Sequence, residues 1–338
     1  MLKATNIMKK ILILSVLVLI AVTVFSQTIT EVTSGNKASL RGLSVVDDNT
    51  IWVSGSGGTV GRSVDAGKTW KWMIVKGFEK NDFRDIEAFD GMTAVIMGIS
   101  DPAYILRTVD GGENWKVVFE NTTRGMFLDA MEFWNEQSGI VIGDPIANKF
   151  FIARTFDGGM TWQDIPKENY PRADSGEACF ASSGTNVRKL TNDEAVFITG
   201  GLKSNLIRRN HKIMLPILQG TESTGANSIA VKNFKTMMIV GGDFNHKDSI
   251  NKNCFITKNA GKSWIAPIDP PNGYRSCVEY IAKKKWVTCG LNGVDYTIDN
   301  GKTFTWINKD SYHVCRKAKK GKSVYFAGGG GRIGKLVL

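Results

Sequence analysis

The chain has 338 residues, a net charge of +11, five cysteines and three histidines. The few histidines and the lack of a Cys-x-x-Cys pair argue against a bound metal, and lysines without interleaved aromatic residues argue against a nucleic-acid groove. No linker or low-complexity tract divides the chain after its first segment, and repetitive β architectures of this length form one domain.

Residues 1–26 form a separate segment. Lys9 and Lys10 precede an apolar run from Ile11 to Phe25, and the small residue Ser26 ends it. This run is short for a membrane span and is typical of a signal peptide, so we expect cleavage and export to the periplasm or the exterior. An uncleaved anchor is the alternative, and the lack of a cysteine directly after the run argues against a lipoprotein.

An eight-residue motif then recurs along the chain. It first reads S-V-D-A-G-K-T-W, and its third residue falls at Asp65, Asp110, Asp157, Asn259 and Asp299. The steps are 45, 47, 102 and 40 residues, so a degenerate copy is expected near residues 206–210. A period in the forties with short strands is typical of a β-propeller that has one repeat per blade.

The flanks of the motif supply the strands of each blade. A strand, a hairpin, an apolar strand that ends in glycine, a third strand, the motif and a fourth strand follow in order. Seven such units predict an all-β, seven-bladed propeller of four-stranded blades over residues 27–338, and we expect a monomer. The last unit lacks its fourth strand, which residues 28–32 can supply, so that the ring closes without an exposed edge.

The motif resembles the Asp box of sialidase-type (BNR) repeats. From about residue 28 the chain resembles exported propellers of the photosystem II stability/assembly-factor type, above all those of Bacteroidetes. Stretches such as "RGLSVVDDNTIWVSGSGG" and "GGGGRIGKL" carry this likeness. The resemblance implies a propeller and is compatible with a scaffold that binds a protein partner, but it does not imply a particular activity.

Two inferences limit the chemistry. The motif residues are expected to be structural, because Asp and Ser/Thr side chains satisfy turn amides and glycine supplies the backbone angle. The glycine runs at residues 55–61 and 328–334 lie between strands rather than before a helix, so no nucleotide cofactor is expected and a nucleotide-dependent oxidoreductase is rejected. The sialidase N-terminal arginine motif is absent, so no sialidase catalytic residue is carried over.

A polar ring is expected where the inner strands begin, around the mouth of the central channel. Guanidinium groups there can bind a carboxylate or sulfate, and we expect that of an acidic glycan. The alternative is a polar plug in which these groups pair with one another. The candidate ligand-binding residues are Arg41, Arg84, Asp85, Asn227, Tyr274, Arg275 and His313.

Whether the protein is an enzyme stays open. Glu177 and Asp129, taken as starts of adjacent inner strands, are the candidate acid/base pair of a glycoside hydrolase. Tyr274 or His313 is the alternative base of a polysaccharide lyase. The competing hypothesis is a non-catalytic scaffold or assembly factor.

The lysines and cysteines leave further alternatives. A lysine cluster on the motif's face either contacts an anionic surface or keeps the hairpins solvated; it comprises Lys283, Lys284, Lys285, Lys319 and Lys320. For the cysteines, one alternative is a disulfide between Cys277 and Cys289. The other is that Cys179, Cys277 and Cys315 are unpaired and occupy equivalent, buried positions of the inner strands.

Overall fold

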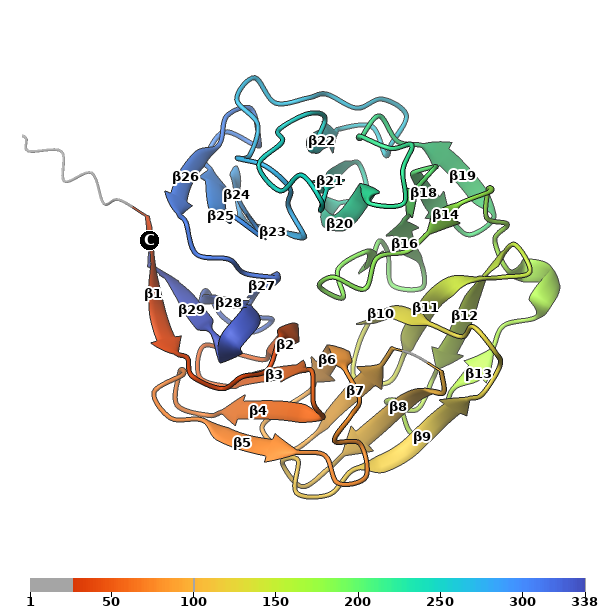
Figure 1. Ribbon diagram of the computed structural model, residues 1–338, viewed down its shortest axis with the longest axis vertical. Coiled ribbons are helices and arrows are strands. Elements are labelled where there is room, and N and C mark those ends of the chain that lie inside the picture. The colour runs from red at the N-terminus through yellow and green to blue at the C-terminus, as the bar shows by residue number, and fades with distance from the viewer. Residues whose placement is uncertain (1–26, 100, 338) are drawn as a thin grey trace, which may run out of the picture.

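A computed structural model describes residues 27–99 and 101–337; the signal peptide expected for residues 1–26 lies outside them. Seven antiparallel sheets, six of four strands and one of five, are arranged in a ring around a central axis (Figure 1), which confirms the predicted all-β, seven-bladed propeller. Among the described residues, no helix has the length and apolar character of a membrane span.

The first three blades follow the predicted strand order without interruption. Their strands are β2 (Leu40–Val45), β3 (Ile51–Gly55), β4 (Thr59–Ser63), β5 (Lys71–Ile74); β6 (Phe83–Ala88), β7 (Ala94–Gly98), β8 (Ala103–Thr108), β9 (Lys116–Asn121); and β10 (Leu128–Phe133), β11 (Gly139–Ile146), β12 (Lys149–Thr155), β13 (Gln163–Asp164). In each blade the first strand lies innermost, beside the channel.

The fourth and fifth blades are less regular. The fourth has β15 (Val187–Lys189), β16 (Ala195–Ile198), β18 (Asn205–Arg208) and β19 (His211–Met214). The fifth has β20 (Thr224–Asn233), β21 (Thr236–Asp243) and β22 (Cys254–Thr257), with an Ile256–Ile265 bridge at its outer edge. Short β14 (Glu177–Ala178) and β17 (Gly200–Gly201) join the sheet of the fifth blade.

The last two blades complete the ring. Their strands are β23 (Cys277–Ala282), β24 (Lys285–Gly290), β25 (Gly293–Thr297), β26 (Thr305–Asn308); and β27 (Val314–Lys317), β28 (Val324–Ala327), β29 (Ile333–Val337), β1 (Thr28–Thr33). β1 pairs antiparallel with β29, as expected, so the N-terminal strand closes the last blade. Two single 3₁₀ turns, Lys167–Asn169 and Gly329–Gly331, lie in connections.

Blades pack face to face, which explains the continuous apolar runs of their second strands. All residues of β3 and of β7 are buried, because both faces of a radial sheet contact neighbouring blades. The hydrophobic clusters accordingly combine residues of adjacent blades, as where β2, β23 and β27 meet beside the closure.

The recurring motif forms the turn between the third and fourth strands. In the first copy Asp65 accepts hydrogen bonds from the Ser63 hydroxyl (2.8 Å) and the Thr69 amide (2.9 Å), while the Gly67 amide donates to Ser63 Oγ (2.9 Å). Equivalent bonds recur at Asp110, Asp157, Asn259 and Asp299. In the fourth blade β18 and β19 are joined at residues 209–210, within the expected range.

The motif's glycine also holds the turn against the preceding blade. Gly112 has a φ of +89°, and a Cβ there would lie 2.9 Å from the sulfur of Met73 in the first blade. A larger residue would meet both the strained backbone and this close contact. The turn therefore fixes the spacing between blades as well as the chain reversal.

The role of the motif's carboxylate can be tested because one copy of the motif has an amide in its place. Asn259 occupies the position of the aspartate, and its side chain makes the corresponding bonds to Ser263. Asp157→Ala should lower the free energy of unfolding by about 1 kcal/mol, since it removes acceptors for the Thr161 amide and hydroxyl. Asp157→Asn and the reciprocal Asn259→Asp should cost less, as measured by denaturant unfolding. Equal losses for Asp157→Asn and Asp157→Ala would contradict this role.

Candidate binding site

One segment is bound to several blades at the end of the channel where the inner strands begin. This segment, residues 180–184 between β14 and β15, reaches toward the centre of the ring; we call it the plug (Figure 1, the light green loop next to the inner end of β10). Four hydrogen bonds tie it to four blades: Arg41 Nη1 to Ser182 O (3.1 Å), Ser182 Oγ to Asn227 Oδ1 (2.9 Å), Ser183 Oγ to Ser276 O (2.8 Å) and Arg316 Nη2 to Gly184 O (3.0 Å).

Asp85 joins the plug to the second and third blades. It is fully buried and accepts hydrogen bonds from the amides of Ile86 and Met131 (both 2.8 Å). A Cβ at Gly184, where φ is +62°, would lie 2.3 Å from the Asp85 carboxyl carbon. Burial raises the pKa of Asp85 well above its usual value, against the effect of the two amides. The predicted ligand-binding residues Arg41, Asp85 and Asn227 therefore contact the plug in this structure.

The three arginines of the predicted ring do not converge. Arg275 is fully buried and bonds to Asp295, to Asn292 Oδ1 (2.5 Å) and to the Tyr274 carbonyl (2.9 Å), all in the sixth blade or its approach. This pairing suits a structural tie, because a buried guanidinium needs every donor satisfied.

Arg41 and Arg84 do lie near each other, beside His313. Burial and then the charge of Arg84 lower the pKa of Arg41. Arg84 Nε donates to Asp82 (2.8 Å), and His313 Nε2 lies 3.2 Å from Ser39 Oγ. Burial and both arginines lower the pKa of His313 to about 3, so the imidazole is neutral.

The side chain of Tyr274 is also buried and hydrogen-bonded within the protein. Its hydroxyl donates to Asn227 Oδ1 (2.8 Å), and burial raises its pKa to about 12. A phenol that holds its proton so firmly is a poor general base near neutral pH.

The prediction that Glu177 begins an inner strand is wrong, and so is the equivalent position expected for Cys179. The inner strand of the fourth blade is β15; Glu177 lies earlier, in β14, which pairs with β17. Its carboxylate accepts from Thr199 Oγ1 (2.5 Å), Asn205 Nδ2 (2.8 Å) and Lys212 Nζ (2.7 Å). The inserted plug displaces the inner strand along the sequence, which a fixed repeat length cannot reveal.

Asp129 differs from Glu177, but the two do not form an accessible pair. Among the described residues, neither oxygen of Asp129 has a hydrogen-bond partner. Burial and then the charge of Asp144 raise its pKa well above the usual value, which the charge of Arg84 only partly offsets. Neither carboxyl residue is more than 4% exposed, so neither can reach an external substrate in this arrangement.

A cavity of about 1110 Å³ opens at the opposite end of the channel, on the face of the hairpins between first and second strands. We call it the hairpin-face cavity. Each inner strand contributes one residue at the same level: Ser44, Glu87, Glu132, Arg188, Ala230, Glu279 and Arg316.

Ion pairs hold the wall of this cavity. Arg188 lies within 3.5 Å of Glu132 and 3.2 Å of Glu279, which belong to the third and sixth blades. Lys319 pairs with Glu87 at 2.6 Å. Burial raises the pKa of Glu279 to about 7 although Arg188 opposes the shift.

Cationic side chains outnumber acidic ones around the hairpin-face cavity, seven to four. All four acids pair with a cation, the fourth being Glu136 with Lys320. Among the described residues, four lining cations make no ion pair: Lys189, Lys232, Arg316 and Lys317. Lys319 and Lys320 of the predicted lysine cluster also line this cavity, and Lys283–Lys285 lie in the hairpin that leads into β24.

The packing of the plug is tested with two glycine variants. Gly184→Ala should lower the free energy of unfolding by about 1–3 kcal/mol more than Gly77→Ala. Both positions have positive φ, but nothing lies within 4 Å of a Cβ at Gly77, so the difference isolates the contact with Asp85. Chemical denaturation measures both, and equal losses would show that the plug is not closely packed.

The neutral state of His313 makes stability depend on pH. Its pKa is lower in the folded chain than in the unfolded chain, so the free energy of unfolding falls as the pH drops from about 6.5 toward 3. Between pH 7 and 5 the wild type should lose about 2 kcal/mol more than His313→Gln. The exposed His211→Gln is the control, and parallel pH profiles for wild type and His313→Gln would contradict the assignment.

Known proteins resemble this chain in structure. No family model matches it, and no curated protein matches it in sequence. A structure of YCF48 bound to D1 peptide is 14% identical and covers 93% of this chain and 97% of its own, with a TM-score of 0.63. YCF48 from Cyanidioschyzon merolae is 16% identical, with coverages of 91% and 98% and a TM-score of 0.66; the WD40 propeller of Doa1 is 11% identical, with coverages of 91% and 97% and a TM-score of 0.64. At these identities the likeness is one of fold.

Proposed function

We propose that this protein is a non-catalytic scaffold that binds an acidic segment of a protein partner in the hairpin-face cavity. The observation that carries the proposal is the excess of cations around a cavity to which all seven inner strands contribute. Its volume of about 1110 Å³ exceeds the roughly 300–1,000 Å³ of most small-molecule pockets. The similar fold of YCF48, which has been solved with a D1 peptide, supports a peptide as the occupant.

The unpaired cations would contact the partner. Lys189 Nζ donates to the Trp134 carbonyl (3.0 Å) and Lys232 Nζ to the Lys283 carbonyl (2.7 Å). These neutral acceptors leave the ammonium charges without a counter-ion. Carboxylates of an entering segment would make charge-assisted hydrogen bonds in their place, which are shorter and stronger than neutral ones.

The opposite mouth supports a ligand less well. The plug occupies it, Arg275 is paired with Asp295, and Glu177 and Asp129 are buried. Binding of an acidic glycan at Arg41 and Arg84 is the alternative function, and the experiment below tests it as well.

We also propose that the protein acts after export. The composition of residues 1–26 supports this, as does the likeness of the recurring turn motif to that of exported BNR-type propellers. In this proposal the cluster Lys283–Lys285 contacts an anionic surface and holds the cavity face near the partner.

The binding proposal is tested by fluorescence anisotropy with matched acidic, neutral and basic peptides. Only the acidic peptide should bind, and more weakly as salt increases. Lys232→Ala/Lys317→Ala should weaken binding about tenfold, or about 1.4 kcal/mol. The control is Lys203→Ala, an exposed lysine in the loop that precedes β18 on the other face.

Two results would contradict the proposal. One is equal affinity for the three peptides, and the other is equal loss in Lys203→Ala and the double variant. Binding of uronate or sulfated oligosaccharides that Arg41→Ala abolishes, without any peptide binding, would favour the glycan function instead.

A further inference from the structure

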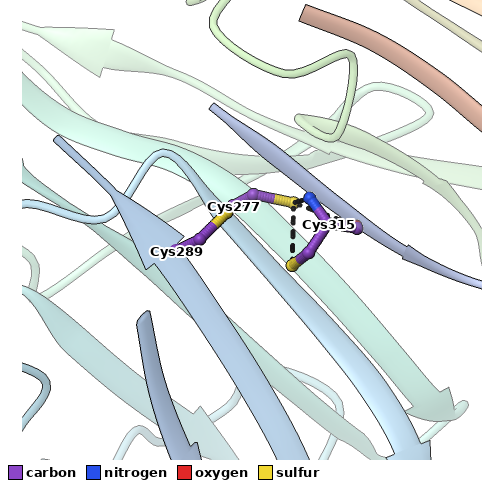
Figure 2. A group of neighbouring side chains, drawn as sticks. All are labelled: Cys277, Cys289 and Cys315. Carbon is purple, nitrogen blue, oxygen red and sulfur yellow. Dashed lines mark hydrogen bonds between the residues drawn. The ribbon is translucent and has the colours of Figure 1, made fainter. Parts of the chain in front are cut away.

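Three cysteine side chains meet beside the channel, between the sixth and seventh blades. Cys277 in β23 pairs across the strands with Cys289 in β24, and Cys315 lies in β27, the neighbouring inner strand (Figure 2). Their sulfur atoms all lie within 4.8 Å of one another, and all three side chains are fully buried. Distances along the sequence gave no sign of this group, because the ring brings two blades together.

The sulfur of Cys277 is surrounded by donors. The Cys315 amide (3.3 Å), the Cys315 thiol (3.6 Å) and the Thr185 hydroxyl (3.6 Å) all lie within hydrogen-bond distance of it. In the neutral form the Cys277 thiol instead donates to the Cys315 carbonyl (3.4 Å). The cluster therefore accepts a thiolate at its centre without rearrangement.

We propose that Cys277, Cys289 and Cys315 form a three-coordinate site for a soft monovalent cation, Cu⁺. Thiolates favour soft metals, whereas Zn²⁺ in proteins takes four ligands. Within the described residues no fourth His, Cys, Asp or Glu joins the group, and burial excludes solvent as a fourth ligand.

The spacing suits trigonal coordination. With metal–sulfur bonds of about 2.3 Å, three sulfurs at the corners of a triangle stand about 4.0 Å apart. Cys277 and Cys315 are 3.6 Å apart, so only small shifts are needed to admit the ion. Coordination replaces the protons of the three thiols, which leave to solvent as the chain folds around the ion, and Arg188 offsets part of the resulting negative charge.

A bound ion would link the sixth blade to the seventh, which is the blade that closes the ring. Because the sulfurs are sealed from solvent, uptake is expected to accompany folding rather than follow it. A cation that binds only the folded chain raises its apparent stability.

The test refolds the full chain under anaerobic, reducing conditions with Cu⁺, then challenges it with the Cu⁺ chelator bathocuproine disulfonate. Wild type should retain one Cu⁺ per chain, show sulfur-to-copper charge transfer in the ultraviolet, and melt at a higher temperature than the copper-free chain. Cys277→Ala, Cys289→Ala and Cys315→Ala should each lose the ion. Cys254→Ala, a buried cysteine outside the cluster, is the matched control and should keep it.

Cys289→Ser nearly preserves side-chain size, so its circular dichroism and melting curve separate loss of ligation from loss of folding. The proposal is overturned if refolded wild type yields its copper to the chelator, or if Cys254→Ala loses copper as the cluster variants do. Retention of one Zn²⁺ in preference to Cu⁺ would also overturn it, since that requires a fourth ligand.

Discussion

Pairing of β1 with β29 is the constraint on which the rest of the molecule depends. A propeller has no layer that covers its sheets, so each blade is stabilised by its two neighbours and an open ring would leave two apolar faces in water. The first and last segments of the described chain meet in one sheet, and this long-range pairing fixes the circumference. The channel, the plug and the cysteine cluster all require that circumference.

The architecture was predictable because the same turn motif, with the same hydrogen-bonding residues, recurs several times in the sequence. Asp65, Asp110 and Asp157 each hold a turn with the same acceptors, and a repeat that recurs at nearly constant steps defines the blades. The closure of the ring was predictable for a related reason. The last repeat lacks a fourth strand, and the chain has an extra strand before the first repeat, so the extra strand is expected to complete the last blade.

The site was not predictable to the same degree. Arg41 and Asp85 were predicted as ligand residues, but in the structure they contact the segment around Ser182 and Gly184, which belongs to no repeat. The same insertion moved the inner strand of the fourth blade past Glu177. A usable signal did exist for the other mouth: Glu87, Glu132 and Glu279 occupy one position of three inner strands, and charge recurring beside a channel indicates a polar lining. The cysteine cluster depends on contacts between blades, which periodicity along the chain does not reveal.

Arg188 spans the channel wall from Glu132 to Glu279 because the fifth blade offers only Ala230 between them. A carboxylate that enters the cavity competes with Glu279 for this one guanidinium. Once released, a carboxyl whose pKa is already about 7 takes up a proton near neutrality. Occupancy of the cavity and proton uptake are then thermodynamically linked, so a fall in pH across the neutral range favours the occupied state.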